Sequence, residues 1–354
     1  MINQKTFESF CSNIFEAVGF SAADAREIAE ILVRSDMRGV VSHGTRLIPK
    51  LLLHIQGGGV DPRAKPEIVE EGPAWSMIDA HGAMGHLAAH RGAHVAMETA
   101  RQSGIGMAGV RQGNHLGPLG AYALMCAEAG MVGLISCNTN NVMAVTGSCE
   151  KSIGNNPFAF AAPTGNEPPI VLDMACSAAA GNKVAMAAQN GTSIPPEWTI
   201  DAEGSTTTDP LDYLQRGGAL LPVGGHKGYG LAIMVEVLAG VLTGASLTGD
   251  IKSWVTETDQ VSDEGYSFIA LDVKSFMPLS EYQERIDGLI RRIRGSRKAK
   301  GVDRIYLPGE IEHEHELKTR AEGISLQDWH VESLKKVAVE LGLESQFDAL
   351  EDES

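Results

Sequence analysis

Segments with strand-like composition alternate with helical segments through the middle of the chain, and this alternation most constrains the fold. Apolar, β-type runs occupy 105–110 and 266–273, and an alanine-rich helical pattern covers 85–103. Alternating strands and helices bury their apolar faces by forming a sheet that is covered with helices. Both ends of the chain show helical patterns. The sequence therefore predicts an α/β core flanked by a helical lobe.

A proline-rich stretch marks the expected boundary between the lobe and the core. Residues 61–73 contain three prolines, which lack a backbone N–H and interrupt regular elements. We expect this stretch to be a linker or an extended connection. The predicted division is a helical lobe at 1–73, joined by the C-terminal helix within 313–354, and an α/β core at 74–312.

Composition argues against several classes of partner. The chain has 29 basic and 45 acidic side chains, a net charge of −16, which repels phosphate backbones and anionic lipids. We therefore expect no nucleic-acid partner and no membrane partner. The longest apolar stretch, 231–245, is interrupted by Glu236 and is shorter than the roughly 20 residues that a bilayer requires. Five cysteines without a C-x-x-C pair, and no secretory pattern over 1–10, favour a cytoplasmic location.

Residues 104–109 read G-I-G-M-A-G and match the glycine pattern of dinucleotide-binding turns. That pattern works when a strand precedes the glycines and a helix follows, so that the helix N-terminus meets the pyrophosphate. Here the order is reversed, because the helical pattern ends at Gly104 and an apolar strand follows. We interpret Gly104 as the residue that ends the helix, and the other glycines as positions of close packing. The motif does not predict a Rossmann turn.

Two groups of histidines raise the question of a metal site. His86, His90 and His94 recur every four residues and would share one face of a helix, with His81 as a candidate fourth ligand. This spacing leaves a metal-dependent hydrolase as a remote alternative. No carboxylate or thiol interleaves at a ligand spacing, so we favour packing at an interface and predict no metal. The second group, at 313–315, alternates with glutamates and is interpreted as a solvated acidic loop.

Two further histidines are the strongest candidates for chemistry. Asn114-His115-Leu116-Gly117 lies between a predicted strand and a predicted helix, and the proline that follows suits the first position of a helix. A histidine at such a turn can face a cleft above a sheet, and its ordinary pKa suits proton transfer near neutrality. Ser42-His43-Gly44 follows the end of a helix. From the residues alone, His115 is either a proton-transfer group or an ordinary surface histidine.

These same residues carry a family resemblance. Residues 36–44, D-M-R-G-V-V-S-H-G, resemble the D-x-R-G-x-x-S-H-G motif of the malate/L-lactate dehydrogenase type 2 family. That family includes ureidoglycolate, sulfolactate and malate dehydrogenases, together with diketogulonate and piperideine-2-carboxylate reductases. Further matches follow in the family's order across nearly the whole chain: Gly113–His115, Ile153–Phe160, Leu172–Ala175, Gly225–Gly230 and Tyr306–Glu310.

The resemblance implies a nicotinamide-dependent oxidoreductase with a fold of its own. The expected fold is a mixed-sheet, three-layer α/β core of the sulfolactate/malate dehydrogenase type 2 kind, not a Rossmann domain, and this core would bind cofactor and substrate. His115 matches the family's catalytic histidine, which exchanges a proton with the substrate hydroxyl. Ser42, His43 and Asp173 match residues proposed in one branch as a proton relay.

The resemblance also indicates two substrate contacts. Arg46 is expected to bind the substrate carboxylate, because a guanidinium fork binds carboxylates bidentately. The family usually has this arginine three residues after the glycine of S-H-G, whereas Arg46 is two residues after Gly44 and Leu47 occupies the usual place. Asn140 stands near the nicotinamide, where the ureidoglycolate branch has an aspartate, which argues against ureidoglycolate as the substrate.

The cofactor contacts that the resemblance implies lie in four segments. They are Thr139, Asp173, Met174, Ala175, Lys227, Gly309, Glu310 and Ile311. Lys227 lies just before a predicted helix, where a cation and free backbone N–H groups can bind phosphate. The alternatives are a solvated Lys227 and an Asp173 that caps the next turn. The cofactor is NAD or NADP, since no residue for the ribose 2′ position stands out.

The leading hypothesis is an NAD(P)-dependent dehydrogenase that acts on a small 2-hydroxy acid such as malate or lactate. Residues 217–222 together with 225–228 also resemble the cyclic imino-acid reductase branch, which reduces piperideine- or pyrroline-2-carboxylate. The expected partner is therefore a small-molecule carboxylate. Because members of the family are typically dimers, the resemblance also implies a homodimer.

Overall fold

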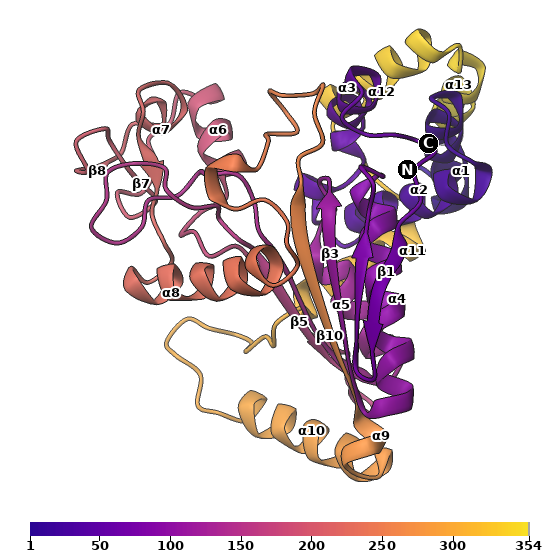
Figure 1. The fold of residues 1–354 in the computed structure, drawn as a ribbon, viewed down its shortest axis with the longest axis vertical. Coiled ribbons are helices and arrows are strands. Elements are labelled where there is room, and N and C mark those ends of the chain that lie inside the picture. The colour runs from indigo at the N-terminus through magenta and orange to yellow at the C-terminus, as the bar shows by residue number, and fades with distance from the viewer. Residues whose placement is uncertain (353–354) are drawn as a thin grey trace.

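A seven-stranded mixed sheet forms the centre of the molecule in the computed structural model, which describes residues 1–352 (Figure 1). Its strand order is β1(Glu67–Gly72), β2(Trp75–Asp79), β3(Ile105–Gly113), β10(Glu264–Asp272), β4(Met131–Cys137), β5(Phe158–Ala162) and β6(Ile170–Met174). β2 and β3 run parallel, and every other neighbouring pair runs antiparallel. The mixed sheet confirms the predicted fold class.

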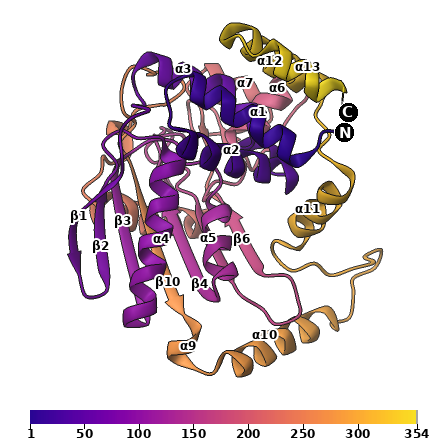
Figure 2. The ribbon, with the colours of Figure 1, turned by 90° about the vertical axis from the view of Figure 1, so that its right-hand side faces the viewer.

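Helices cover both faces of this sheet. On one face lie α4(Gly85–Ser103) and α5(Leu119–Glu128) (Figure 2). On the other lies the π-helical segment Glu236–Val241, which continues directly from α8(His226–Val235). The central strand β10 shows both contacts. Phe268 packs against Gly92 of α4, whereas Gly265 lies directly against the backbone of Ala239 in the π-helical segment. The core therefore has three layers, as predicted.

The glycines at 104–109 serve helix–sheet packing. α4 ends at Ser103, Gly104 follows with φ 84°, and β3 begins at the next residue. A side chain at Gly106 would collide with the backbone of Ala96 in α4, and one at Gly109 would come within 2.8 Å of the Met77 sulfur. The reversed order is thus confirmed, and these glycines let α4 and a neighbouring strand approach β3 closely.

The helical lobe contains both ends of the chain. It consists of α1(Gln4–Ala17), α2(Ala22–Met37), α3(Ile48–Gly57), α12(Asp328–Leu341) and α13(Glu344–Asp352). One apolar core joins them, with Phe10 of α1 against Phe347 of α13 at 5.7 Å between ring centroids. A backbone bridge between Ile2 and Ile324 closes the lobe. The first and last helices therefore lie side by side (Figure 2).

The sheet begins earlier than the proline-rich stretch suggested. β1 lies within 61–73 and pairs with β2 as a hairpin, so this segment is an edge of the sheet. We propose that the lobe of 1–73 with 313–354 and the core of 74–312 are separate units, because most of each apolar cluster comes from one of them. The structure corrects the boundary in two places: β1 belongs to the core sheet, and Met84 and Leu87 pack with the lobe cluster. Residues 353 and 354 of that division lie outside the described residues.

Smaller elements complete the chain. A three-stranded sheet in the order β8(Thr206–Thr207), β7(Thr199–Ile200) and β9(Ala219–Leu220) lies beside α6(Gly181–Gln189) and α7(Pro210–Gln215). The remaining helical elements are α9(Val273–Phe276), α10(Leu279–Arg294), α11(Glu310–Glu322), and the single turns Val41–His43, Thr45–Leu47 and Thr248–Asp250. Within residues 1–352 the structure has no helix that is both long and apolar enough to cross a membrane.

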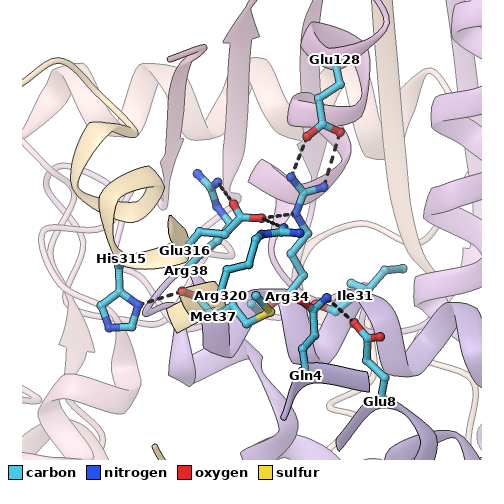
Figure 3. A network of polar contacts seen from close by, with 11 residues as sticks. Gln4, Glu8, Ile31, Arg34, Met37, Arg38, Glu128, His315, Glu316 and Arg320 are labelled. Carbon is cyan, nitrogen blue, oxygen red and sulfur yellow. Dashed lines mark hydrogen bonds and ion pairs between the residues drawn. The ribbon is translucent and has the colours of Figure 1, made fainter. Parts of the chain in front are cut away.

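The segment around 313–315 is a helix, and its prediction as a solvated acidic loop is wrong. It lies within α11, where Glu316 is buried and accepts hydrogen bonds from Arg34 at 3.1 Å and Arg38 at 2.7 Å (Figure 3). Burial alone would raise the pKa of Glu316, but the two arginines lower it. Arg34 also pairs with Glu128 of α5 at 2.6 Å. Arg34 of α2 therefore forms ion pairs with both α11 and α5, and its pair with Glu128 joins the lobe to the core.

Candidate functional site

Aromatic rings gather around His115, just beyond the end of β3. Its imidazole stacks on the indole of Trp254, with 4.4 Å between ring centroids and 15° between planes. The ring of His43 lies nearly parallel at 5.8 Å, and His86 of α4 approaches edge-on at 6.4 Å. We call these four residues the ring cluster. It brings together the lobe, α4, the turn after β3 and the loop before β10.

Asn114 explains why these segments meet. Its side-chain amide donates to the backbone oxygens of Gly59, Gly82 and Ala83, each at 3.1 Å, and its oxygen accepts the N–H of Ser262 at 2.9 Å. A buried amide whose nitrogen and oxygen are both hydrogen-bonded holds its partners firmly. Asn114 thereby ties the lobe, the start of α4 and the loop before β10 to the turn after β3.

The ring cluster has buried polar atoms without partners, while His43, His115 and Trp254 are half-buried as whole residues. Nε2 of His115 and both ring nitrogens of His86 are buried and have no hydrogen-bond partner among the described residues. Burial lowers the pKa of His115 well below its ordinary value and that of His86 to about 3, and neighbouring histidines lower both further. These effects favour the neutral form of His115, whose Nε2 is not used by any hydrogen bond within the described residues.

The S-H-G segment lies against this cluster. Ser42 Oγ and His43 Nδ1 are 2.9 Å apart, and burial lowers the pKa of His43 to about 4. Asp36, whose role sequence reasoning missed, holds the segment from beneath. Its carboxylate accepts the N–H of Thr45 at 3.0 Å and the Thr45 hydroxyl at 2.6 Å, and a side chain at Gly44 would collide with it. The first residue of the motif, Asp36, thus packs directly against its last residue, Gly44.

Arg46 is directed by the C-terminal part of the lobe. Its guanidinium lies over the ring of Trp329 in α12, 5.3 Å from the centroid, and His330 bonds Thr45 at 3.1 Å. Arg46 stands one residue earlier than the family's usual arginine, and at this position its guanidinium stacks on Trp329 from the C-terminal part of the chain. Sequence reasoning missed Trp254 and Trp329, and the only signal for them is that tryptophan is scarce here, with four in the chain.

Asp173 lies apart from the other members of the expected relay. It ends β6, and its carboxylate accepts the N–H of Gly120 at the start of α5 at 2.8 Å. Asp173 is exposed to solvent as a residue. Desolvation of its carboxylate by the surrounding protein nevertheless raises its pKa to about 6, despite that hydrogen bond. Among the described residues it has no hydrogen bond to Ser42, His43 or His115. The structure brings those three together and leaves Asp173 at a helix N-terminus.

A loop between β4 and β5 presents Thr139 and Asn140. Asn156 accepts the backbone N–H of Thr139 at 3.1 Å and donates to the buried Glu236 at 2.7 Å. Asn155 accepts the Thr139 hydroxyl at 2.9 Å. Asn140 is half-buried and makes no side-chain hydrogen bond among the described residues. The loop is held from within, so its outer groups are available to a ligand.

Lys227 and the segment at 309–311 each lie at the N-terminus of a helix, α8 and α11 respectively. Lys227 is exposed in the first turn of α8 and forms no ion pair within the described chain, and a side chain at the preceding Gly225 would meet open space. Gly309 begins α11 with φ 84° and packs tightly against Val171 of β6. Half-buried Met174 and Ala175 follow directly after Asp173.

Glu310 serves the protein itself through its side chain. Its buried carboxylate pairs with Arg294 at 2.8 Å and with Arg304, and it accepts the N–H of Leu307 at 2.9 Å. Ile311 is 59% exposed. A ligand at this turn would therefore meet the backbone of Gly309 and Glu310 and the side chain of Ile311.

The histidines considered as metal ligands do not converge. His86 faces His115, whereas His90 pairs with Glu27 at 3.1 Å and contacts His94 edge-on at 4.5 Å. His81 lies beside Asp79 at 3.2 Å. Within the part of the chain that the structure describes, no group of three histidine, cysteine or carboxylate side chains is placed to hold a metal ion.

These features fit a dinucleotide between the ring cluster and the two helix N-termini. A free basic nitrogen at His115 suits the reacting end of a redox cofactor and its substrate. Lys227 and the free N–H groups at the start of α8 suit phosphate. We call the second region, Thr139, Asp173–Ala175, Lys227 and Gly309–Ile311, the cofactor strip.

Comparison with known proteins shows the family of the chain. The model of the malate/L-lactate dehydrogenase family matches residues 2–335. Malate dehydrogenase from Pyrococcus horikoshii is 36% identical over 346 residues, which cover 95% of this chain and 94% of that protein. The hydrolase alternative has no support among these relatives.

Solved structures show the same fold. Sulfolactate dehydrogenase from Methanocaldococcus jannaschii superposes with a TM-score of 0.91 at 30% identity over 99% of both chains. Δ1-piperideine-2-carboxylate reductase from Pseudomonas syringae superposes with a TM-score of 0.87 at 30% identity, over 96% of this chain and 99% of that one. Family match, sequence identity and fold agree, and the chain belongs to the malate/L-lactate dehydrogenase family.

Proposed function

We propose that the protein transfers a hydride between a nicotinamide cofactor and a small 2-hydroxy acid, with the matching 2-oxo acid as the other substrate. The observation that carries this proposal is His115 at the centre of the ring cluster, with a buried Nε2 that has no hydrogen-bond partner among the described residues. A neutral imidazole is suited to accept a hydroxyl proton. The relatives named above as malate and sulfolactate dehydrogenases support a hydroxy acid as the substrate.

The chemistry assigns one proton to His115. A bound nicotinamide would supply the two-electron acceptor for the hydride of the substrate carbon. In the oxidation, the hydroxyl proton passes to the imidazole of His115, leaving a carbonyl product and an imidazolium. In the reduction, the imidazolium returns its proton to the developing alkoxide. Ser42 and His43, joined at 2.9 Å, lie beside His115 as the next groups along which a proton can move.

Arg46 and Asn140 supply the substrate contacts in this proposal. The Trp329 ring holds the Arg46 guanidinium on one face, which leaves its N–H edge available for a carboxylate. The side-chain amide of Asn140 has no hydrogen-bond partner among the described residues. It is neutral, so it can offer hydrogen bonds to a substrate without adding a charge. The proposed substrate is therefore a small carboxylate rather than a cation.

The cofactor strip is the proposed binding site for NAD or NADP. Lys227 and the N-terminus of α8 would contact phosphate, and Thr139, Asp173, Met174, Ala175 and Gly309–Ile311 would line the remaining length. Asp173 lies in β6, next to the start of α5. Its carboxylate accepts the N–H of Gly120 in α5 and does not cap the turn that follows Asp173. We propose that it orients a hydroxyl or amide group of the cofactor and takes part in the proton relay only through bound molecules.

A second copy of the chain is the proposed partner. The outer face of α8 and its π-helical continuation exposes Ile233, Met234, Val237, Val241 and Leu242, each between 37% and 58% accessible. A contiguous apolar face of this kind is typical of a subunit interface. We therefore propose a homodimer, and a cytoplasmic location in keeping with five free cysteines, of which four are buried.

Reduction of cyclic imino acids is the second candidate. The superposition on Δ1-piperideine-2-carboxylate reductase favours it, because hydride addition to a C=N bond needs the same geometry. The test follows the absorbance of NADH and NADPH separately with oxaloacetate, pyruvate, other 2-oxo acids and cyclic imino acids. Turnover of a 2-oxo acid supports the leading proposal and shows which cofactor is used. Turnover of cyclic imines alone transfers the function to the second candidate, and silence with both contradicts both.

A further inference from the structure

Trp254 makes the closest ring contact of the candidate base. The centroids of Trp254 and His115 are 4.4 Å apart and the planes differ by 15°, so the imidazole lies flat against the indole face. The electron-rich face of tryptophan attracts a cation more strongly than that of any other side chain. When His115 takes a proton it becomes such a cation, without a carboxylate partner among the described residues.

The loop that presents Trp254 is anchored independently of this stack. Thr258 accepts the N–H of Gly59 at 3.0 Å, and Gln260 accepts a hydrogen bond from His54 at 3.0 Å, both from the end of α3. Ser262 donates to Asn114 at 2.9 Å. Trp254 itself is half-buried and packs on the lobe core. These contacts hold the indole in place, and they remain when its side chain is changed.

The other groups near His115 oppose its protonation. His43 lies on the S-H-G turn, His86 on α4, and His54 and Lys50 on α3, and each disfavours positive charge on His115, after the larger effect of burial. The nearby groups thus all act in one direction. Among the described residues, the indole face is the contact whose electrostatics act in the other.

We propose that Trp254 is a positioning residue for His115: its indole fixes the plane of the imidazole and stabilises the imidazolium that proton transfer creates. This inference rests on the proposed role of His115 as the proton acceptor. The stack orients Nε2, and the cation–π attraction keeps the base strong enough to remove a hydroxyl proton despite its burial.

The test compares Trp254→Leu with Trp254→Phe. Leucine removes the π face while it still excludes water, whereas phenylalanine retains a weaker face. We measure kcat/KM for the oxidation against pH, whose rising limb reports the pKa of the base in the free enzyme. The limb should move to lower pH by about 0.5–1 unit in Trp254→Leu and by less in Trp254→Phe, with a loss of kcat in the same order. Trp75→Leu, on the distant β1–β2 hairpin, is the control and should leave the limb unchanged.

The opposite shift and the absence of a shift both overturn the proposal. If Trp254 only excluded water, its removal would hydrate His115 and move the limb to higher pH. If it only filled space, kcat would fall with the limb unmoved. An NMR titration of the His115 ring, assigned with His115→Asn, measures the same shift without substrate. A lower His115 pKa in Trp254→Leu would therefore support the stack even if no tested substrate turned over, and an unchanged pKa would reject it even in an active enzyme.

Discussion

The ring cluster and the cofactor strip differ in residue type, in burial and in charge. The ring cluster is aromatic and mostly half-buried, and several of its ring nitrogens lack partners at the point where chemistry is expected. The cofactor strip has exposed Lys227, the reachable Asp173 and backbone at two helix N-termini. A low dielectric strengthens proton transfer and makes charge costly, whereas a phosphate-bearing ligand requires charge and free N–H groups. Each region therefore performs a task that the other cannot.

The largest expected effect is on the free nitrogen of the ring cluster. His115→Asn should lower kcat by about 10²–10⁴-fold, the range for loss of a general base. Binding of the cofactor, measured by fluorescence titration, should change by less than about twofold because the strip is untouched. His90→Asn, whose ring pairs with Glu27 outside the cluster, is the matched control. Near-normal turnover in His115→Asn would remove the functional distinction between the two regions.

The second prediction concerns the amide that assembles the ring cluster. Asn114→Ala leaves the buried backbone oxygens of Gly59 and Ala83 without their donor and the N–H of Ser262 without its acceptor, so we expect a loss of about 2–4 kcal/mol in the free energy of unfolding. Urea denaturation measures it. Asn190→Ala, an exposed asparagine at the end of α6, should cost far less. Equal costs would show that the cluster is assembled by other contacts.

Glu316 sharpens the comparison because it is charged, buried and fully paired. Glu316→Gln should cost about 2–3 kcal/mol in the free energy of unfolding at neutral pH. Because its folded pKa is lowered, the stabilisation is complete above the unfolded pKa of about 4.3 and is lost as pH falls through the folded value. The gap between the two proteins should therefore narrow below about pH 4. A gap that is constant with pH would mean that shape rather than charge stabilises this contact.

The smallest expected effect is in the cofactor strip. Lys227→Ala should weaken cofactor binding about tenfold, as removal of one charge from an exposed phosphate contact does, with kcat nearly unchanged at saturation. Isothermal titration in low and moderate salt checks it, since the wild-type advantage should shrink with salt. Lys183→Ala on α6 is the control for net charge. If both variants bind alike, Lys227 is a solvated lysine.

Local patterns in the sequence predicted what local physics determines. The alternation of strands and helices, the reversed glycine motif and the position of His115 at a strand-to-helix turn all follow from neighbouring residues, and the structure has each of them. The pairing of β1 with β2 was not predicted from the sequence, because the prolines that flank β1 suggested a linker. The alternation at 313–315 was misleading, because in a helix residues two apart face different sides.

The missed parts of the site depend on contacts distant in sequence. Trp254 reaches His115 because Asn114 and His54 position its loop, and Trp329 reaches Arg46 because α12 returns to the lobe. No pattern within a short window contains these pairs. The family resemblance supplied residues for the cofactor strip, but it did not reveal that the Glu310 carboxylate is occupied by Arg294 and Arg304.

The bridge between Ile2 and Ile324 has a consequence for how the molecule is made. α1 and α2 are synthesised before the sheet, yet Phe10 is covered by Phe347 of α13, which is synthesised after it. The nascent chain therefore carries an uncovered apolar surface while the sheet is translated and folds behind it. The turn that holds Ser42 and His43 likewise lacks its hydrogen bond to His330 until α12 has been made. The helical lobe is thus completed only after the sheet has been translated, although α1 and α2 precede the sheet in the sequence.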